Sequence, residues 1–306
     1  MIAKDTVQKN SNRKSIFALT PYVKFSALAV ISLAIWWRPL ASSFSLALHD
    51  EQYTHLLLIL PVSVALIFID WETPGLSSRA SRITGLSLLV AGAAVTVLVR
   101  SGITRISADE KLSLNMLALV VWWVGAIILC FGARAFRRAL FPLCFLLWIV
   151  PIPLFLLNSI VKLLQAGSVA SAHLLFSAVG LPVAEDRTLL TIPGLTVEVA
   201  RECSSIRSSL MLVVTTMVLT QTLLRSAWKK TLVIAVAIPL SVAKNGLRIF
   251  VLAMLATRVD RSYLTGRLHH QGGIIYFLVA LAAILLFIGL ARHGEQKLRA
   301  AAITDL

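Results

Sequence analysis

The stretch GIIYFLVALAAILLFIGLA, residues 273–291, indicates the class of fold. It continues for 19 residues without a charged side chain. A helix that crosses the hydrocarbon core of a bilayer needs about 20 predominantly apolar residues. This stretch therefore predicts a membrane-spanning helix near the C-terminal end of the sequence.

Seven further stretches of similar length and composition predict seven more spanning helices. We therefore expect an all-α integral membrane protein with eight transmembrane helices. A single transmembrane domain would cover residues 22–291, between a basic N-terminal tail, 1–21, and a C-terminal tail, 292–306. The other seven predicted spans are 22–42, 55–71, 82–100, 112–131, 139–160, 206–224 and 231–257.

The composition of the 306-residue chain agrees with this class. Hydrophobic residues make up 58% and charged residues 14%, whereas an ordinary soluble domain has roughly 25% charged residues. Such a composition excludes most soluble folds, and it excludes disorder, which requires low hydrophobicity. The net charge of +15 is not gathered into a dense run. We therefore expect no nucleic-acid partner, and the basic residues instead mark cytoplasmic loops.

The distribution of Lys and Arg predicts that both termini are cytoplasmic. With the N-terminus inside and eight spans, 16 basic residues fall on the cytoplasmic side and 10 on the outer side. The apolar run 168–181 is short for a span, so we expect an interfacial or re-entrant helix there. If it spans instead, every later orientation reverses. The motif Val150-Pro151-Ile152-Pro153 predicts a kink or break in the fifth helix.

Three polar segments at similar depth are the candidates for chemistry, because ionisable groups within membrane segments tend to be functional. Cys203 lies at the expected outer end of the sixth span. Arg248 lies about 25 Å along the seventh span, within its outer third. His269 enters the eighth span from the outside. The expected topology therefore brings a thiol, a guanidinium and an imidazole to the outer face.

A Cys, a His and an Arg at one depth suit thiol acyl transfer. The thiolate attacks a carbonyl, and the His moves the proton. The Arg stabilises the oxyanion and favours the thiolate. Cys130 and Cys144 lie in apolar runs and are most simply packing residues. The spacing of the three cysteines does not suggest a metal site, and this chemistry needs no cofactor.

Three alternatives use overlapping residues. A serine nucleophile is available in Ser204 or Ser205, although a G-x-S-x-G motif is missing from the sequence. A transporter or channel would use Lys244 and Arg248, with Glu198 and Glu202, as a substrate path. A purely hydrolytic intramembrane protease would share the transferase residues and differ only in its acceptor.

The chain also resembles the exosortase/archaeosortase family of multi-pass membrane transpeptidases over roughly residues 50–290. The resemblance rests on the order and spacing of several short motifs. In chain order these are Phe141-Pro142, Val150-Pro151-Ile152-Pro153, Gly180-Leu181-Pro182-Val183, Glu198-Val199-Ala200 before Cys203-Ser204, Asn245-x-x-Arg248, and His269-x-x-x-Gly273 with Phe277.

The resemblance implies a function and a cellular place. Family members are thought to process membrane-anchored proteins with a C-terminal sorting tail, which consists of a short motif, a transmembrane helix and a basic cluster. The tail would be cleaved through a thioacyl-enzyme at the outer face of the bacterial inner membrane, and the protein passed to an acceptor that the sequence does not identify. In bacteria such enzymes are associated with export and extracellular polysaccharide production.

The resemblance also assigns roles to residues. By family position Cys203 would be the nucleophile, with Arg248 and His269 as the other catalytic residues. Two positions depart from the family pattern: Ser205 replaces a usual Gly, and His270 replaces a usual Glu. The sorting motif of this chain is therefore expected to differ from Pro-Glu-Pro. The residues expected to support the catalytic group are Glu198, Ser204, Asn245 and His270.

Overall fold

The computed structural model describes residues 2–69, 78–103, 106–199, 206–260, 262 and 273–304. Cys203, Ser204, His269 and His270 lie outside these ranges. The chain forms two compact units, Met1–Leu154 and Phe155–Leu306, and each is described by itself. Within the described ranges, eight helices are long and apolar enough to cross a membrane. The expectation of an all-α membrane protein with about eight spanning helices is confirmed.

The N-terminal unit is built from helices. Its long helices α1 and α4 contain internal breaks: α1 departs from helical geometry at Trp36, and α4 does so at Gly132. The elements are α1 (Ile2–His49), the short 3-10 helix η1 (Glu51–Tyr53), α2 (Leu56–Ile69), α3 (Arg79–Arg100), α4 (Ala108–Arg138), α5 (Leu140–Phe145) and the 3-10 helix η2 (Leu146–Ile149).

Helices α3 and α4 approach closely because glycines line their contact. A Cβ atom added to Gly85 would lie 2.6 Å from the backbone nitrogen of Leu129, and one added to Gly92 would lie 2.8 Å from the carbonyl oxygen of Ala118. A larger residue at either position would force the two backbones apart. The start of α4 is fixed by a capping box between Ser107 and Glu110.

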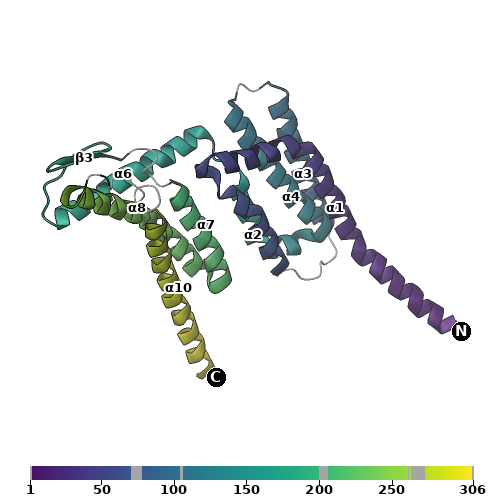
Figure 1. Ribbon diagram of the computed structural model, residues 1–306. Coiled ribbons are helices and arrows are strands. Elements are labelled where there is room, and N and C mark those ends of the chain that lie inside the picture. The colour runs from purple at the N-terminus through teal and green to yellow at the C-terminus, as the bar shows by residue number, and fades with distance from the viewer. Residues whose placement is uncertain are drawn as a thin grey trace. The chain divides into compact units, whose positions relative to one another are not determined.

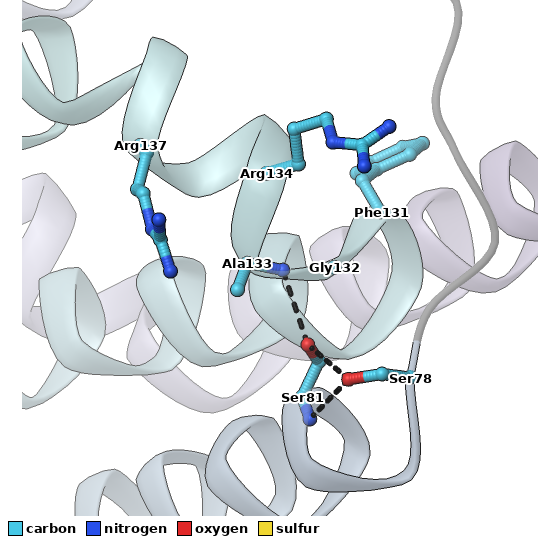
Figure 2. A pocket seen from close by; sticks show the side chains of 7 residues that line it. All are labelled: Ser78, Ser81, Phe131, Gly132, Ala133, Arg134 and Arg137. Carbon is cyan, nitrogen blue, oxygen red and sulfur yellow. Dashed lines mark hydrogen bonds between the residues drawn. The ribbon is translucent and has the colours of Figure 1, made fainter.

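The break in α4 at Gly132 depends on the left-handed conformation of this residue, whose φ is +82°. The break leaves the Ala133 N–H without its helical acceptor, and the Ser81 hydroxyl of α3 accepts it at 3.2 Å. Figure 2 shows Ser81 bridging Ala133 and the hydroxyl of Ser78, the residue that caps α3. The predicted end of the fourth span, residue 131, therefore coincides with a real break in the helix.

The segment 140–153 returns along α4. It leaves α4 at its C-terminal end and reaches the N-terminal part of the same helix, where the Ser113 hydroxyl donates to the Pro151 carbonyl at 2.7 Å. The Tyr53 hydroxyl donates to the next carbonyl, of Ile152, at 3.2 Å. Asp109 then accepts the backbone N–H of Leu154 at 2.9 Å. Side chains of neighbouring elements thus satisfy backbone groups that a helix would otherwise pair.

The predicted fifth span, 139–160, is wrong in its bounds. A helix cannot continue through Pro151 and Pro153, because neither residue has an N–H and each ring clashes with the preceding turn. The structure has α5 and η2 before these prolines, and α6 (Leu154–Ala178) after them. The predicted break at this motif is therefore confirmed. The run 168–181 is not a separate short helix, since its residues up to 178 form the second half of α6.

The C-terminal unit combines helices with a small antiparallel sheet. The strands are β1 (Ala184–Asp186), β2 (Leu189–Ile192) and β3 (Leu195–Glu198), in the order β1-β2-β3. Gly194, with a φ of +82°, forms the turn between the last two strands. The helices after the sheet are α7 (Ile206–Leu223), α8 (Ala227–Arg258) and α10 (Gly273–Thr304).

Two apolar clusters hold this unit together. One joins α7, α8 and α10 through residues that include Leu212, Ala237 and Ile284. The other packs the inward-facing β2 residues Leu190 and Ile192 against α6 and α8. Figure 1 shows that α6 runs steeply across the direction of α7 and α10. The small sheet was not expected from the sequence.

Helices α6 and α8 cross at a close contact between small residues. A Cβ atom added to Gly246 of α8 would lie 2.5 Å from the Cβ of Ser171 on α6. A Cβ atom added to Gly167 of α6 would lie 2.8 Å from the Val242 side chain on α8. The crossing thus depends on a glycine from each helix, and it brings the backbone of α6 against the segment of α8 that precedes Arg248.

Candidate active site

The candidate site lies in the C-terminal unit, around Arg248 on α8. Arg248 is half-buried, and it lies one helical turn after Lys244 on the same face of the helix. The Lys244 side chain is only 6% exposed. Its ammonium donates a hydrogen bond to the Ser208 hydroxyl, in the first turn of α7. Two cations and a hydroxyl from two helices are therefore brought together.

This pair of cations is costly to maintain. Like charges four residues apart destabilise a helix, and charged side chains within a membrane segment are expensive. In the part of the chain that the structure describes, no carboxylate pairs with Lys244. A positive field of this kind stabilises an anion, such as the oxyanion of a tetrahedral intermediate or a thiolate.

Tyr276 extends the cluster to a third helix. It lies in the first turn of α10, near enough to Arg248 for the guanidinium charge to act on its phenol. The sequence analysis did not single out this residue, because a tyrosine within an apolar span is more often an interfacial anchor. The start of α10, which follows His269 by four residues, therefore lies near the arginine of α8.

The strand that leads toward Cys203 is anchored on both sides. Val199 is fully buried, and its N–H donates to the Thr188 carbonyl at 2.8 Å. Its own carbonyl accepts a hydrogen bond of 2.9 Å from the amide of Gln165, a buried residue of α6. The backbone is thus fixed four residues before the predicted nucleophile. Gln165 was not predicted from the sequence, since a lone glutamine in an apolar helix belongs to no motif.

The helix that carries Arg248 is tied to the same face of α6. The Asn245 amide donates to the Ser168 hydroxyl at 2.9 Å, and both side chains are about 1% exposed. Ser168 lies three residues after Gln165, so the two contacts are neighbours on α6. Helix α6 therefore contacts both the segment that leads toward Cys203 and the helix that carries Arg248.

The other predicted site residues have different surroundings. Glu198 ends β3 opposite Leu189 and is exposed. Among the described residues, no cation forms an ion pair with its carboxylate, so its role beside Arg248 stays a prediction. The catalytic roles of Cys203 and His269, and the support expected from Ser204 and His270, stay predictions as well, because these residues lie outside the described ranges.

Of the remaining cysteines, Cys130 has the environment of a packing residue, whereas the expectation of a packing role for Cys144 does not agree with its exposure. Cys130 is buried in α4, whereas Cys144 is exposed in α5, and both belong to the N-terminal unit. Neither takes part in the polar cluster around Arg248. They provide natural controls for experiments on Cys203.

Comparison with known proteins gives one finding. The model of a protein family described as transmembrane exosortase matches residues 23–286. The match covers most of the chain and includes both compact units. No curated protein sequence and no solved structure matches the chain.

Proposed function

The chain belongs to the transmembrane exosortase family, and from this premise we propose that it is a cysteine transpeptidase that removes the C-terminal sorting tail of membrane-anchored proteins. Family membership supports a membrane transpeptidase or protease. The observation that carries the finer proposal is the juxtaposition of Arg248, Lys244 and Ser208 in the C-terminal unit.

Chain connectivity limits the distance between Cys203 and this cluster. Ser208 lies five positions after Cys203, and a fully extended chain covers at most about 3.6 Å per residue. The two Cα atoms are therefore within about 18 Å of each other. By the same reasoning the Cα of His269 is within about 14 Å of that of Gly273, at the start of α10. Cys203 and His269, the predicted partners of Arg248, are thus close in the chain to α7 and α10, and both of these helices pack against α8.

The first half of the reaction forms a thioester. The Cys203 thiolate attacks a backbone carbonyl carbon of the substrate, just before its tail helix. The positive charges of Arg248 and of the neighbouring Lys244 stabilise the oxyanion that develops. His269 gives a proton to the nitrogen of the breaking C–N bond, and the tail leaves with a free amine.

The second half releases the protein from the enzyme. An acceptor amine or a water molecule loses a proton to the neutral His269 as it attacks the thioester carbonyl. The C–S bond breaks, and the Cys203 thiolate is restored. An amine acceptor makes the reaction a transfer, and water makes it hydrolysis. The substrate's tail helix reaches the site laterally from the bilayer.

We place the site at the outer face of the bacterial inner membrane, with both termini cytoplasmic. The broken segment 140–153 makes the fifth crossing in this arrangement, because it returns along the length of α4. Helix α6 is long and apolar enough to cross the membrane, but in this arrangement it begins at the outer face and lies along the interface, inclined to α7 and α10 (Figure 1). The next crossing, by α7, begins at the outer side, immediately after Cys203.

Coexpression with a tail-bearing protein tests this function. We expect tail cleavage with the unmodified enzyme and its loss in Cys203→Ala, whereas Cys130→Ala and Cys144→Ala should retain it. The end group of the released product then distinguishes transfer from hydrolysis. Unchanged cleavage in Cys203→Ala would exclude a thiol mechanism.

A further inference from the structure

A second cluster of cations, far from the candidate active site in sequence, surrounds a hollow in the N-terminal unit. The hollow has a volume of about 650 Å³ and is lined by residues of α1, α3 and α4. Arg38 of α1, Arg100 of α3 and Lys111 of α4 all line it. Each cation comes from a different helix, so the fold, and not a local run of basic residues, brings the three charges together.

The cations of this hollow are not paired with carboxylates of the described residues. In the described part of the chain, none of the three cations forms an ion pair. The two acidic residues next to Lys111 are used elsewhere: Asp109 accepts the Leu154 N–H, and Glu110 accepts the Ser107 N–H in the capping box. The hollow therefore presents three positive charges to whatever occupies it.

The walls of the hollow are amphipathic. Apolar surface comes from Ile35, Trp37 and Leu112, and the Trp37 ring is 67% exposed. A polar wall comes from Asn115, which is 7% exposed and whose amide nitrogen donates to the Lys111 carbonyl at 2.7 Å. The Asn115 carbonyl oxygen accepts no hydrogen bond from the described residues. Cationic and aromatic side chains at the ends of spanning helices are typical of the headgroup region of a membrane.

We propose that this hollow binds the phosphate group of an anionic phospholipid. Arg38 follows the break in α1 at Trp36, Arg100 is the last residue of α3, and Lys111 lies in the first turn of α4. Two cations at helix ends, with a third beside the kink of α1, match a phosphate at headgroup depth. The apolar wall with Trp37 matches the start of the acyl chains. The inference is independent of the proposed peptidase activity.

The hollow at the opposite end of α4 provides a contrast. It has a volume of about 350 Å³, and two cations, Arg134 and Arg137, line it (Figure 2). Its hydroxyl groups are already engaged, since Ser78 and Ser81 bond to each other and Ser81 accepts the Ala133 N–H. It offers two cations, whereas the other hollow offers three, so we assign the lipid to the three-cation hollow.

Thermal unfolding of the full-length protein in a neutral detergent tests the proposal. The probes are phosphatidylglycerol, phosphatidylcholine and inorganic phosphate. We compare the unmodified protein with an Arg38→Gln/Arg100→Gln/Lys111→Gln variant. The control variant, Lys162→Gln/Arg187→Gln/Arg258→Gln, loses the same net charge from exposed positions of the other unit.

We expect phosphatidylglycerol to raise the Tm of the unmodified protein and of the control variant. The hollow variant should need an about tenfold higher concentration of phosphatidylglycerol for the same rise in Tm, or show no rise. An equal effect of phosphatidylglycerol on all three proteins would overturn the proposal. An equal effect of inorganic phosphate and phosphatidylglycerol would overturn the assignment to a lipid. If the triple variant does not fold, Lys111→Gln alone is compared by the number of lipids retained in native mass spectrometry, where unchanged retention counts against the site.

Discussion

The Asn245 amide of α8 donates a 2.9 Å hydrogen bond to the Ser168 hydroxyl of α6, although 77 residues separate the two positions. Asn245 lies directly after Lys244 and one turn before Arg248. The bond therefore fixes the rotation of α8 about its axis at the turn that carries Lys244 and Arg248. The neighbouring contact between Gln165 and the Val199 carbonyl fixes the strand before Cys203 to the same helix.

Asn245→Ala is expected to lower the free energy of unfolding by about 1–3 kcal/mol, because it leaves a buried hydroxyl without its donor. Tail cleavage should fall by more than this loss of folded protein explains, because α8 can then rotate. Thermal unfolding and cleavage by the same preparation measure both effects. Ser241→Ala is the control, since Ser241 is equally buried but bonds within its own helix. Equal effects of the two variants on cleavage would contradict the role of the bond.

Lys244→Met is expected to reduce tail cleavage about 100-fold, because it removes one of the two charges that we propose to stabilise the oxyanion. Lys244→Arg should retain part of the activity. Lys229→Met provides a matched control: Lys229 is a buried lysine of the same helix, and it bonds to the Ala291 carbonyl on α10. A comparable loss of cleavage in the control, at equal amounts of folded enzyme, would show that any buried lysine of α8 matters equally.

Gln165→Met should impair cleavage by releasing the strand that precedes Cys203. The substitution keeps the length of the side chain but removes the donor to the Val199 carbonyl, at a cost of about 1–3 kcal/mol for the unsatisfied group. Hydrogen exchange should accelerate at β2 and β3 and remain unchanged in α3. Protection of the strands at the level of the unmodified protein would mean that Gln165 does not hold them.

The depth of α6 can be measured by labelling single cysteines. Ser159 and Ser177 are both exposed, and they lie about 27 Å apart along this helix. We introduce Ser159→Cys or Ser177→Cys into a chain in which the three native cysteines are replaced by serine. A membrane-impermeant maleimide added to the outside should label both positions if α6 lies along the outer interface. Labelling of only one of them from that side would show that α6 crosses the bilayer.

Hydropathy predicted the spanning helices well, because a bilayer requires long apolar helices whatever their partners are. The break at Val150-Pro151-Ile152-Pro153 was also predictable, since proline excludes a continuous helix there. The bounds of α6 were not, because Asn158 and Lys162 in its first half and His173 in its second half interrupt the apolar pattern. Their cost in a helix depends on neighbours that the sequence does not show.

The small sheet and the supporting contacts were missed for a related reason. Strands β1 to β3 contain three or four residues each, too few for an alternating pattern to stand out. Gln165, Ser168 and Tyr276 carry no motif of their own. Their contacts join residues far apart in the sequence, whereas Arg248 was singled out from the sequence because a cation within an apolar helix requires an explanation.

The most direct test of the central claim is intact-protein mass spectrometry of the enzyme mixed with a tail-bearing substrate. We predict that the mass of the enzyme increases by the mass of the processed substrate. Hydroxylamine should remove this adduct, as expected for a thioester, and the adduct should map to the peptide that contains Cys203. Arg248→Met should slow its appearance, and Cys203→Ala should abolish it. An adduct on another residue, such as Ser208, or cleavage without any dependence on Cys203, would contradict the account.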